Sequence, residues 1–297
     1  MWCAGWELAS AVSNAGGLGI IGAGSMYPDV LRDQIKKCQA ATSQPFAVNV
    51  PLLYPAVEEH METIVALKVP IVFTSAGSPK TWTSHLKSHG IKVVHVVSSS
   101  AFAIKSELAG VDAVVAEGFE AGGHNGREET TTMCLIPAVS QVCHIPVIAA
   151  GGLHDGKSIL AAMVLGAEGA QLGSRFVASE ESSAHRAFKD AVLAAKEGST
   201  TFTLKELTPV RMLHNALFKE VAQAQQSGAT PERLKEVMGR GKAKKGMFEG
   251  DIENGELEIG QIASLLQSVR PAAEIISEIV NDYRETGGAK LGQRFEF

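Results

Sequence analysis

The stretch Glu117-Gly118-Phe119-Glu120-Ala121-Gly122-Gly123-His124-Asn125-Gly126 follows residues 111–116, a short apolar run of the kind that forms a buried strand. Its four glycines disfavour regular structure, and they allow positive φ angles and close approach to a ligand. His124 lies in the middle of this loop, and an imidazole suits proton transfer because its pKa lies near neutral pH. Ligands of α/β proteins bind at the carboxyl ends of strands, so the stretch predicts a site around His124.

Strand-like and helical segments alternate on both sides of this stretch. A helix is expected at residues 6–14, and each later strand is followed by a helix, as in βαβ units. Seven strands are expected, at residues 18–21, 46–50, 69–74, 91–97, 111–116, 146–150 and 167–172. The sequence therefore predicts an α/β protein, a (β/α)8 TIM barrel that lacks its first strand. A doubly wound sheet is disfavoured because no GxGxxG opens a helix after the first strand.

The alternation stops near residue 197. Helices are expected at residues 209–227, 231–238 and 260–284, separated by glycine-rich and charged segments. Two domains are therefore expected: a barrel over residues 1–198, and a mainly helical second domain or lid over residues 199–297.

Composition narrows the classes of partner. The 297 residues carry a net charge of −5, so nucleic acid is an unexpected partner. The basic cluster Arg240, Lys242, Lys244 and Lys245 is local, and it is either a solvated helix end or a contact for an anion or an acidic carrier protein. No apolar run is long enough for a membrane span, and no signal peptide is expected. Four cysteines without C-x-x-C spacing are typical of a reducing compartment, so a cytoplasmic location is expected.

Glycines also end the last two predicted strands. The segments are Ala149-Ala150-Gly151-Gly152 and Gln171-Leu172-Gly173-Ser174. In many barrels the loops after strands seven and eight bind phosphate through backbone N–H groups, and Ser174 can add a hydroxyl donor. Glycines at strand ends can also simply make tight turns, but two such sites on adjacent strands favour phosphate.

Asn49 lies at the end of the strand at residues 46–50, where its amide could bind the edge of a heteroaromatic ring. Together with His124 and the phosphate loops, it predicts a planar phosphorylated cofactor across the barrel mouth. Flavin mononucleotide (FMN) fits that description. A metal is not expected, because no pair of histidines or carboxylates has ligand spacing.

Four motifs carry a resemblance to a known family. They are residues 14–22 (NAGGLGIIG), 116–126 (AEGFEAGGHNG), 146–152 (PVIAAGG) and 169–176 (GAQLGSRF). The chain resembles the nitronate monooxygenase and FMN-dependent enoyl-acyl-carrier-protein reductase II family over nearly its whole length. The resemblance implies an FMN-binding barrel with a helical second domain, in a protein that is often a homodimer.

The resemblance also implies roles for particular residues. His124 matches the catalytic histidine, and Met1 matches the methionine that ends the first strand in relatives. The residues implied as cofactor contacts are Met1, Asn49, Glu117, Gly122, Gly123, Ala150, Gly151, Gly152, Gln171, Gly173 and Ser174. Position 117 is Gln in many nitronate monooxygenases, and Glu117 is more similar to the reductase branch.

Two reactions follow from the resemblance. The favoured one is reduction of enoyl-acyl-carrier-protein thioesters in fatty acid synthesis, with NADH or NADPH as reductant and a small-molecule or carrier-linked substrate. The alternative is a nitronate monooxygenase that oxidises alkyl nitronates with O2. An inactive flavin-binding relative is a third possibility.

Overall fold

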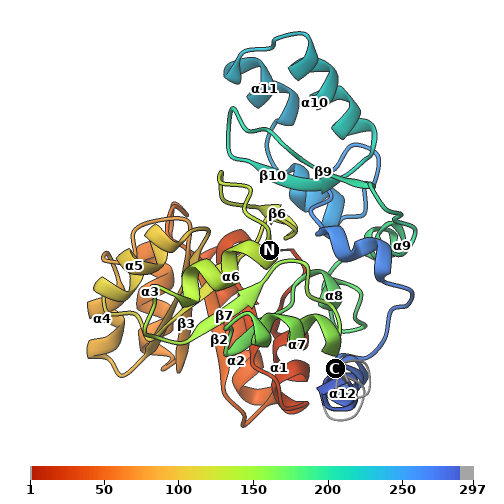
Figure 1. The fold of residues 1–297 in the computed structure, drawn as a ribbon. Helices are drawn as coiled ribbons and strands as arrows, with labels where there is room; N and C mark the ends of the chain where they lie inside the picture. The colour runs from red at the N-terminus through yellow and green to blue at the C-terminus, as the bar shows by residue number, and fades with distance from the viewer. Residues whose placement is uncertain (1, 288–297) are drawn as a thin grey trace.

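The computed structural model describes residues 2–287 of the chain. Its main sheet has seven parallel strands whose neighbours follow the chain order (Figure 1). They are β1 (Gly19–Gly22), β2 (Phe46–Pro51), β3 (Ile71–Ser75), β4 (Lys92–Val97), β5 (Ala113–Glu117), β7 (Val147–Ala150) and β8 (Gly169–Gln171). Within the described residues β1 and β8 do not pair with each other, so the barrel stays open there. The predicted barrel lacking one strand is confirmed.

Helices follow the strands and cover the outside of the sheet. They are α1 (Trp6–Asn14), α2 (Pro28–Ala41), α3 (Val57–Ala66), α4 (Thr83–Ser88), α5 (Ser100–Leu108), α6 (Thr132–Ser140), α7 (Gly156–Val164) and the short α8 (Ser174–Val177), with a 3-10 turn, η1 (Ala23–Ser25), after β1. Local sequence explains their starts. Pro28 occupies the first turn of α2, and Asp155 with Ser158 forms a capping box at α7.

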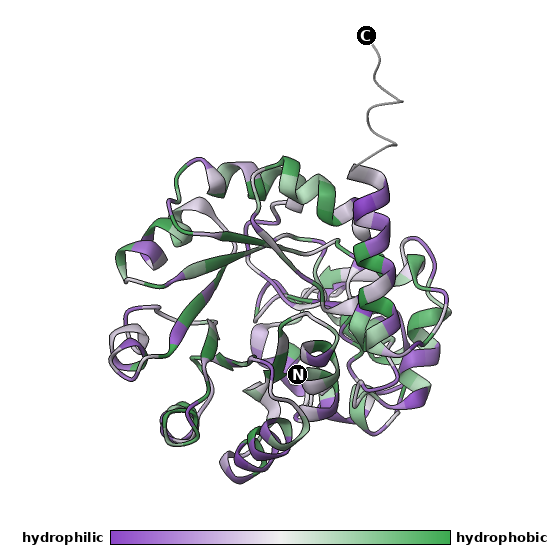
Figure 2. Ribbon diagram, turned by 90° about the horizontal axis from the view of Figure 1, so that it is seen from below, coloured by the Kyte–Doolittle hydropathy of each residue, from purple (hydrophilic) through white to green (hydrophobic). Residues whose placement is uncertain are grey.

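The core has two layers because successive strand residues point to opposite faces of the sheet. Val72 and Val114 face outward and pack in the large cluster under the helices. Phe73 and Val115 face inward and belong to a small cluster inside the barrel. Figure 2 shows the apolar character of the strands. The sequences of the strands are nearly continuous apolar runs because both of their faces are covered.

The segment after the barrel contains strands that the sequence analysis missed. Residues 209–227 were expected to form one helix, but β10 (Val210–Leu213) precedes α10 (Ala216–Gln226). β10 pairs antiparallel with β9 (Thr200–Thr203), whose threonines and phenylalanine favour strands. Asn215 accepts a hydrogen bond from the Phe218 N–H and caps α10, which places the boundary. The predicted helix at residues 209–227 is therefore wrong over its first part.

The C-terminal part is helical but interrupted. It comprises α9 (Arg186–Leu193), α11 (Pro231–Met238), the π-helical turn η2 (Lys244–Phe248), the 3-10 turn η3 (Gln261–Leu265) and α12 (Ala272–Glu285). The single helix expected at residues 260–284 is wrong, because extended backbone at Leu266 and a proline at position 271 separate η3 from α12. The helix α12 packs against α7 and α1, on the outside of the barrel. None of the helices in residues 2–287 is long and apolar enough to cross a membrane.

Candidate functional site

The loop after β5 carries His124 into a second sheet. Residues Gly123–His124 form the two-residue strand β6, which pairs antiparallel with β10. In this register Val210 lies opposite His124, and Arg211 lies opposite Gly123. The strand β6, which carries His124, thus connects the loop after β5 with the strand β10, and Figure 1 shows β6 between the barrel and β10.

Arg211 holds the loop after β5 at Phe119. Its side chain is only 2% exposed, and its Nη2 and Nε donate hydrogen bonds to the Phe119 carbonyl oxygen at 2.9 and 3.2 Å. The guanidinium carbon also lies 4.5 Å from the centre of the Phe119 ring, a cation–π geometry. A buried arginine with these partners stabilises one loop conformation, and sequence reasoning did not single it out.

Glu120 attaches the same loop to the start of α6. Its carboxylate accepts hydrogen bonds from the Thr132 backbone N–H at 2.9 Å and from the Thr132 hydroxyl at 3.0 Å, at the start of α6. Carboxylates at a helix N-terminus satisfy free N–H groups there. A side chain at position 118 would meet Thr132 backbone atoms at 2.5 Å, so the loop requires glycine at this contact.

The hydrogen bonds of His124 define its neutral tautomer. Nδ1 lies 3.1 Å from the Pro209 carbonyl oxygen. A carbonyl oxygen can only accept, so Nδ1 carries the proton and donates it to this bond. The lone pair of the neutral ring is therefore on Nε2, where it can accept a proton or a hydrogen bond.

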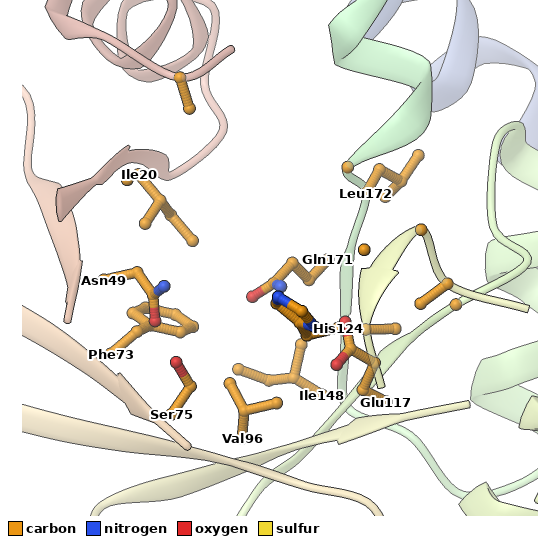
Figure 3. A pocket seen from close by; sticks show the side chains of 18 of the residues that line it. Ile20, Asn49, Phe73, Ser75, Val96, Glu117, His124, Ile148, Gln171 and Leu172 are labelled. Carbon is orange, nitrogen blue, oxygen red and sulfur yellow. The ribbon is translucent and has the colours of Figure 1, made fainter. Parts of the chain in front are cut away.

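A cavity of about 1540 Å³ opens at the carboxyl ends of the strands. Figure 3 shows Asn49, Glu117, His124 and Gln171 around it, with apolar residues such as Ile148 between them. All of the predicted site residues in the described part of the chain line this one cavity: Asn49, Glu117, Gly122, Gly123, His124, Ala150, Gly151, Gly152, Gln171, Gly173 and Ser174. Met1 lies outside the described residues. The fold thus brings together the residues that the sequence analysis selected, while their individual roles stay predictions.

Several of these residues fit a phosphorylated aromatic cofactor. The buried side-chain oxygens of Asn49 and Gln171 have no hydrogen-bond partner, so each can accept a bond from a ligand N–H group. Gly151 has a φ of 90°, which suits a tight turn without a side chain. At Gly173 an added Cβ would meet no atom within 4 Å, so the backbone borders open space. Ser174 Oγ accepts a bond from the Gly260 N–H at 2.9 Å, which leaves its hydroxyl proton available.

The C-terminal segment closes one side of the cavity, which sequence reasoning did not find. Ile259, Ile262, Met247 and Glu258 line it, although they lie more than 120 positions after His124. A Cβ at Gly122 would lie 2.4 Å from the Gly260 nitrogen, so this glycine permits the contact between the loop and the C-terminal segment. The glycines of the loop indicated that another segment or a ligand approaches the backbone closely. The sequence did not show that this segment is the one around Gly260.

Glu117 has an unusual environment for a carboxyl group. It makes no side-chain hydrogen bond or ion pair within residues 2–287, and desolvation raises its pKa to about 7. A carboxyl group in this state is protonated in a large fraction of molecules at neutral pH. It can therefore donate a hydrogen bond to a ligand.

We expect Glu117→Gln to stabilise the flavin-free protein at pH 8 but not at pH 5. Because the folded-state pKa lies above the ordinary value, the native carboxyl holds its proton more tightly than the unfolded one. The parent chain therefore loses stability as pH rises toward 7, and the amide does not. The expected gain is about 1–3 kcal/mol at pH 8, measured by urea unfolding. An equal effect at both pH values, or the same pH trend in the exposed control Glu58→Gln, would contradict this.

A family model and a curated relative both match the chain to nitronate monooxygenases. The family model described as nitronate monooxygenase matches residues 1–66 and 54–282. A probable nitronate monooxygenase of Staphylococcus aureus (strain MSSA476) is 32% identical over 325 residues, covering 94% of this chain and 91% of the relative.

Two solved structures resemble the fold closely. FabK from Thermotoga maritima is 40% identical with a TM-score of 0.94, covering 99% of this chain and 93% of that one. Nitroalkane oxidase from Streptomyces ansochromogenes is 27% identical with a TM-score of 0.83, covering 97% and 94%.

Proposed function

Because the chain belongs to the nitronate monooxygenase family, it is an FMN-dependent oxidoreductase, and we propose that it reduces the double bond of enoyl thioesters with NADH or NADPH. The observation that carries the choice of reaction is Glu117 at the end of β5, inside the cavity. By the motif resemblance described in the sequence analysis, this position corresponds to glutamine in many nitronate monooxygenases, and Glu117 is more similar to the reductase branch. The similarity to FabK, at 40% identity over 99% of this chain, supports the same branch.

Different residues of the cavity would bind the phosphate and the ring of FMN. The backbone at Gly151, Gly152 and Gly173 would receive the phosphate, and Asn49 and Gln171 would accept hydrogen bonds from the ring edge. Bound FMN supplies the two-electron redox chemistry, which no side chain of the site can provide.

His124 would exchange a proton with the substrate. Its Nδ1–H stays bonded to the Pro209 carbonyl, so proton exchange takes place at Nε2. When protonated, Nε2–H can donate a hydrogen bond to a thioester carbonyl oxygen, or a proton to the carbon next to it, directly or through one water. The Pro209 contact keeps the ring in one orientation during this exchange.

The second candidate is oxidation of alkyl nitronates or nitroalkanes. The curated relatives carry that name, and the lone pair on Nε2 of neutral His124 could accept the acidic proton of a nitroalkane. The two functions make opposite demands on the substrate: one needs an electron-accepting double bond, and the other an electron-donating carbon.

Product analysis distinguishes the two functions. The FMN-loaded protein is supplied with NADH or NADPH and crotonyl thioester, and separately with an alkyl nitronate in air. The proposal predicts butyryl thioester two mass units heavier than the substrate, formed without oxygen. Consumption of the nitronate with oxygen uptake, and no butyryl product with either nucleotide, would support the monooxygenase instead.

We further propose that the lysines near η2 contact an acidic carrier protein. Lys242, Lys244 and Lys245 lie together in the C-terminal part, and Lys244 pairs with Glu249 at 3.0 Å. Changing all three to Glu should lower turnover of a carrier-linked enoyl substrate about tenfold or more, because the variant repels an acidic partner. Turnover of the same acyl group on free pantetheine should not change. Equal turnover of the carrier-linked substrate by parent and variant would reject this docking surface.

A further inference from the structure

One part of the cavity wall, called the arm below, contains no predicted cofactor contact. It is formed by the loop that leads into α4, by β4 and the residues just after it, and by α5. Val94 and Val96 face the barrel interior, so the residue between them, His95, faces the helices. The residues that line this arm are Pro79, Lys80, His95, Ser98, Phe102 and Lys105.

His95 is a buried polar side chain, and only one of its two ring nitrogens, Nδ1, has a hydrogen-bond partner in the described residues. It is 4% exposed, and its Nδ1 lies 2.7 Å from the Thr74 hydroxyl oxygen. When the proton of the neutral ring is on Nε2, the Thr74 hydroxyl donates to Nδ1; the same hydroxyl also lies 3.4 Å from the Val94 carbonyl oxygen. Burial lowers the pKa of His95 to about 4, so the ring is neutral and carries one proton.

The Nε2–H of His95 makes no hydrogen bond within residues 2–287, although His95 lines the cavity. Nε2 is not among the fully buried unpaired atoms of the described residues, so it is open to the cavity and, when protonated, can donate a hydrogen bond to a ligand there.

Two lysines supply the charge of this arm. Lys80 and Lys105 are the cationic residues among those that line the cavity, and both lie in this arm. In the described part of the chain neither ammonium forms an ion pair, although Lys105 Nζ lies 5.3 Å from the centre of the Phe102 ring. The carboxylates that line the cavity, Glu117, Glu120 and Glu258, belong to other segments.

We propose that this arm is a binding site for a phosphate group on the substrate or on the reductant, with Lys80, Lys105 and the Nε2–H of His95 as donors. Phosphate offers several acceptor oxygens and two negative charges near neutral pH, which match two ammonium groups and one imidazole N–H. The Phe102 ring provides an apolar wall for the organic part of the ligand. The site shares one cavity with His124, so a ligand held here by its phosphate could extend toward the reactive centre.

The site rests on the proposed function only for the identity of the molecule that carries the phosphate. Two sources share this chemistry: the phosphopantetheine arm of a thioester substrate and the phosphates of a nicotinamide nucleotide. Binding measured without turnover therefore tests the site separately from the reaction.

Calorimetry with matched pairs of probes tests the site on the FMN-loaded protein. One pair is 4′-phosphopantetheine and pantetheine, and the other is reduced nicotinamide mononucleotide and its riboside. We expect the phosphorylated member of at least one pair to bind about tenfold tighter or more. The double variant Lys80→Gln, Lys105→Gln should abolish that difference, and His95→Phe should reduce it.

The control carries the same change in charge away from the cavity. Lys36 on α2 and Lys219 on α10 are exposed, and Lys36→Gln, Lys219→Gln should bind the probes as the parent does. A preference in the pantetheine pair assigns the site to the substrate arm, and a preference in the nucleotide pair assigns it to the reductant. If neither pair shows a preference, or if the Lys80, Lys105 variant keeps it, the proposal is wrong. The lysine variant decides the result even where His95→Phe fails to fold.

Discussion

Replacing His124 by alanine is expected to reduce turnover of the true substrate by about 10²–10⁴-fold, the usual contribution of a positioned acid or base. The variant should still bind FMN. The side chain is exposed and its one hydrogen bond, from Nδ1 to the Pro209 carbonyl, links two surface segments. Its loss therefore removes the proton-exchanging Nε2 without opening the core.

Two measurements separate a role in proton transfer from a structural role. The flavin absorbance spectrum of purified His124→Ala should match that of the parent at equal protein concentration, while its turnover number falls. His144, whose side chain is 88% exposed and lies outside the cavity, provides the matched control, and His144→Ala should leave turnover unchanged. Loss of bound flavin from His124→Ala would show that the histidine is structural.

Arg211→Met is expected to destabilise the fold by about 2–4 kcal/mol, the largest effect on stability that we predict for a single side chain. The guanidinium donates twice to the Phe119 carbonyl and once to the Thr200 hydroxyl, at 3.3 Å. Methionine fills much of the space but removes both hydrogen bonds to that partly buried carbonyl. The loop between β5 and β6 should then loosen, and FMN should bind more weakly.

Urea unfolding of parent and variant checks this expectation. Arg186 provides a contrast, because its side chain is 73% exposed and its ion pair with Asp190 lies on the surface. Arg186→Met should change stability by less than about 1 kcal/mol. A similarly small effect of Arg211→Met would mean that the loop holds its conformation without the guanidinium.

The barrel could be predicted from the sequence because each of its elements has a local signal. The helix α1 was predicted with its observed bounds, and in α2 Pro28 occupies the first turn while Leu31, Ile35 and Cys38 repeat on the buried face. The strand β10 could not be predicted in this way. Its sequence, Val-Arg-Met-Leu, has no alternation of polar and apolar residues, because both faces of the strand are covered: Val210 and Met212 pack against α10 and α11, and Leu213 packs with the C-terminal segment.

The candidate site was predictable where its residues end strands. Asn49, Gln171 and the glycines after β7 and β8 were selected because parallel strands bring their carboxyl ends to one edge. Arg211, Ile259 and His95 were not selected. They reach the site through contacts between segments distant in sequence, or they look like ordinary strand residues. An outward-facing histidine such as His95 becomes informative only when its unpaired nitrogen is seen beside a cavity.

Anaerobic stopped-flow absorbance tests the proposed reaction most directly. The FMN-loaded protein is first mixed with NADH or NADPH, and the reduced protein is then mixed with crotonyl thioester. We expect one of the nucleotides to bleach the flavin absorbance rapidly, and the thioester to restore it. If neither nucleotide bleaches the flavin, while an alkyl nitronate does and oxygen restores the absorbance, the enoyl reductase assignment is wrong.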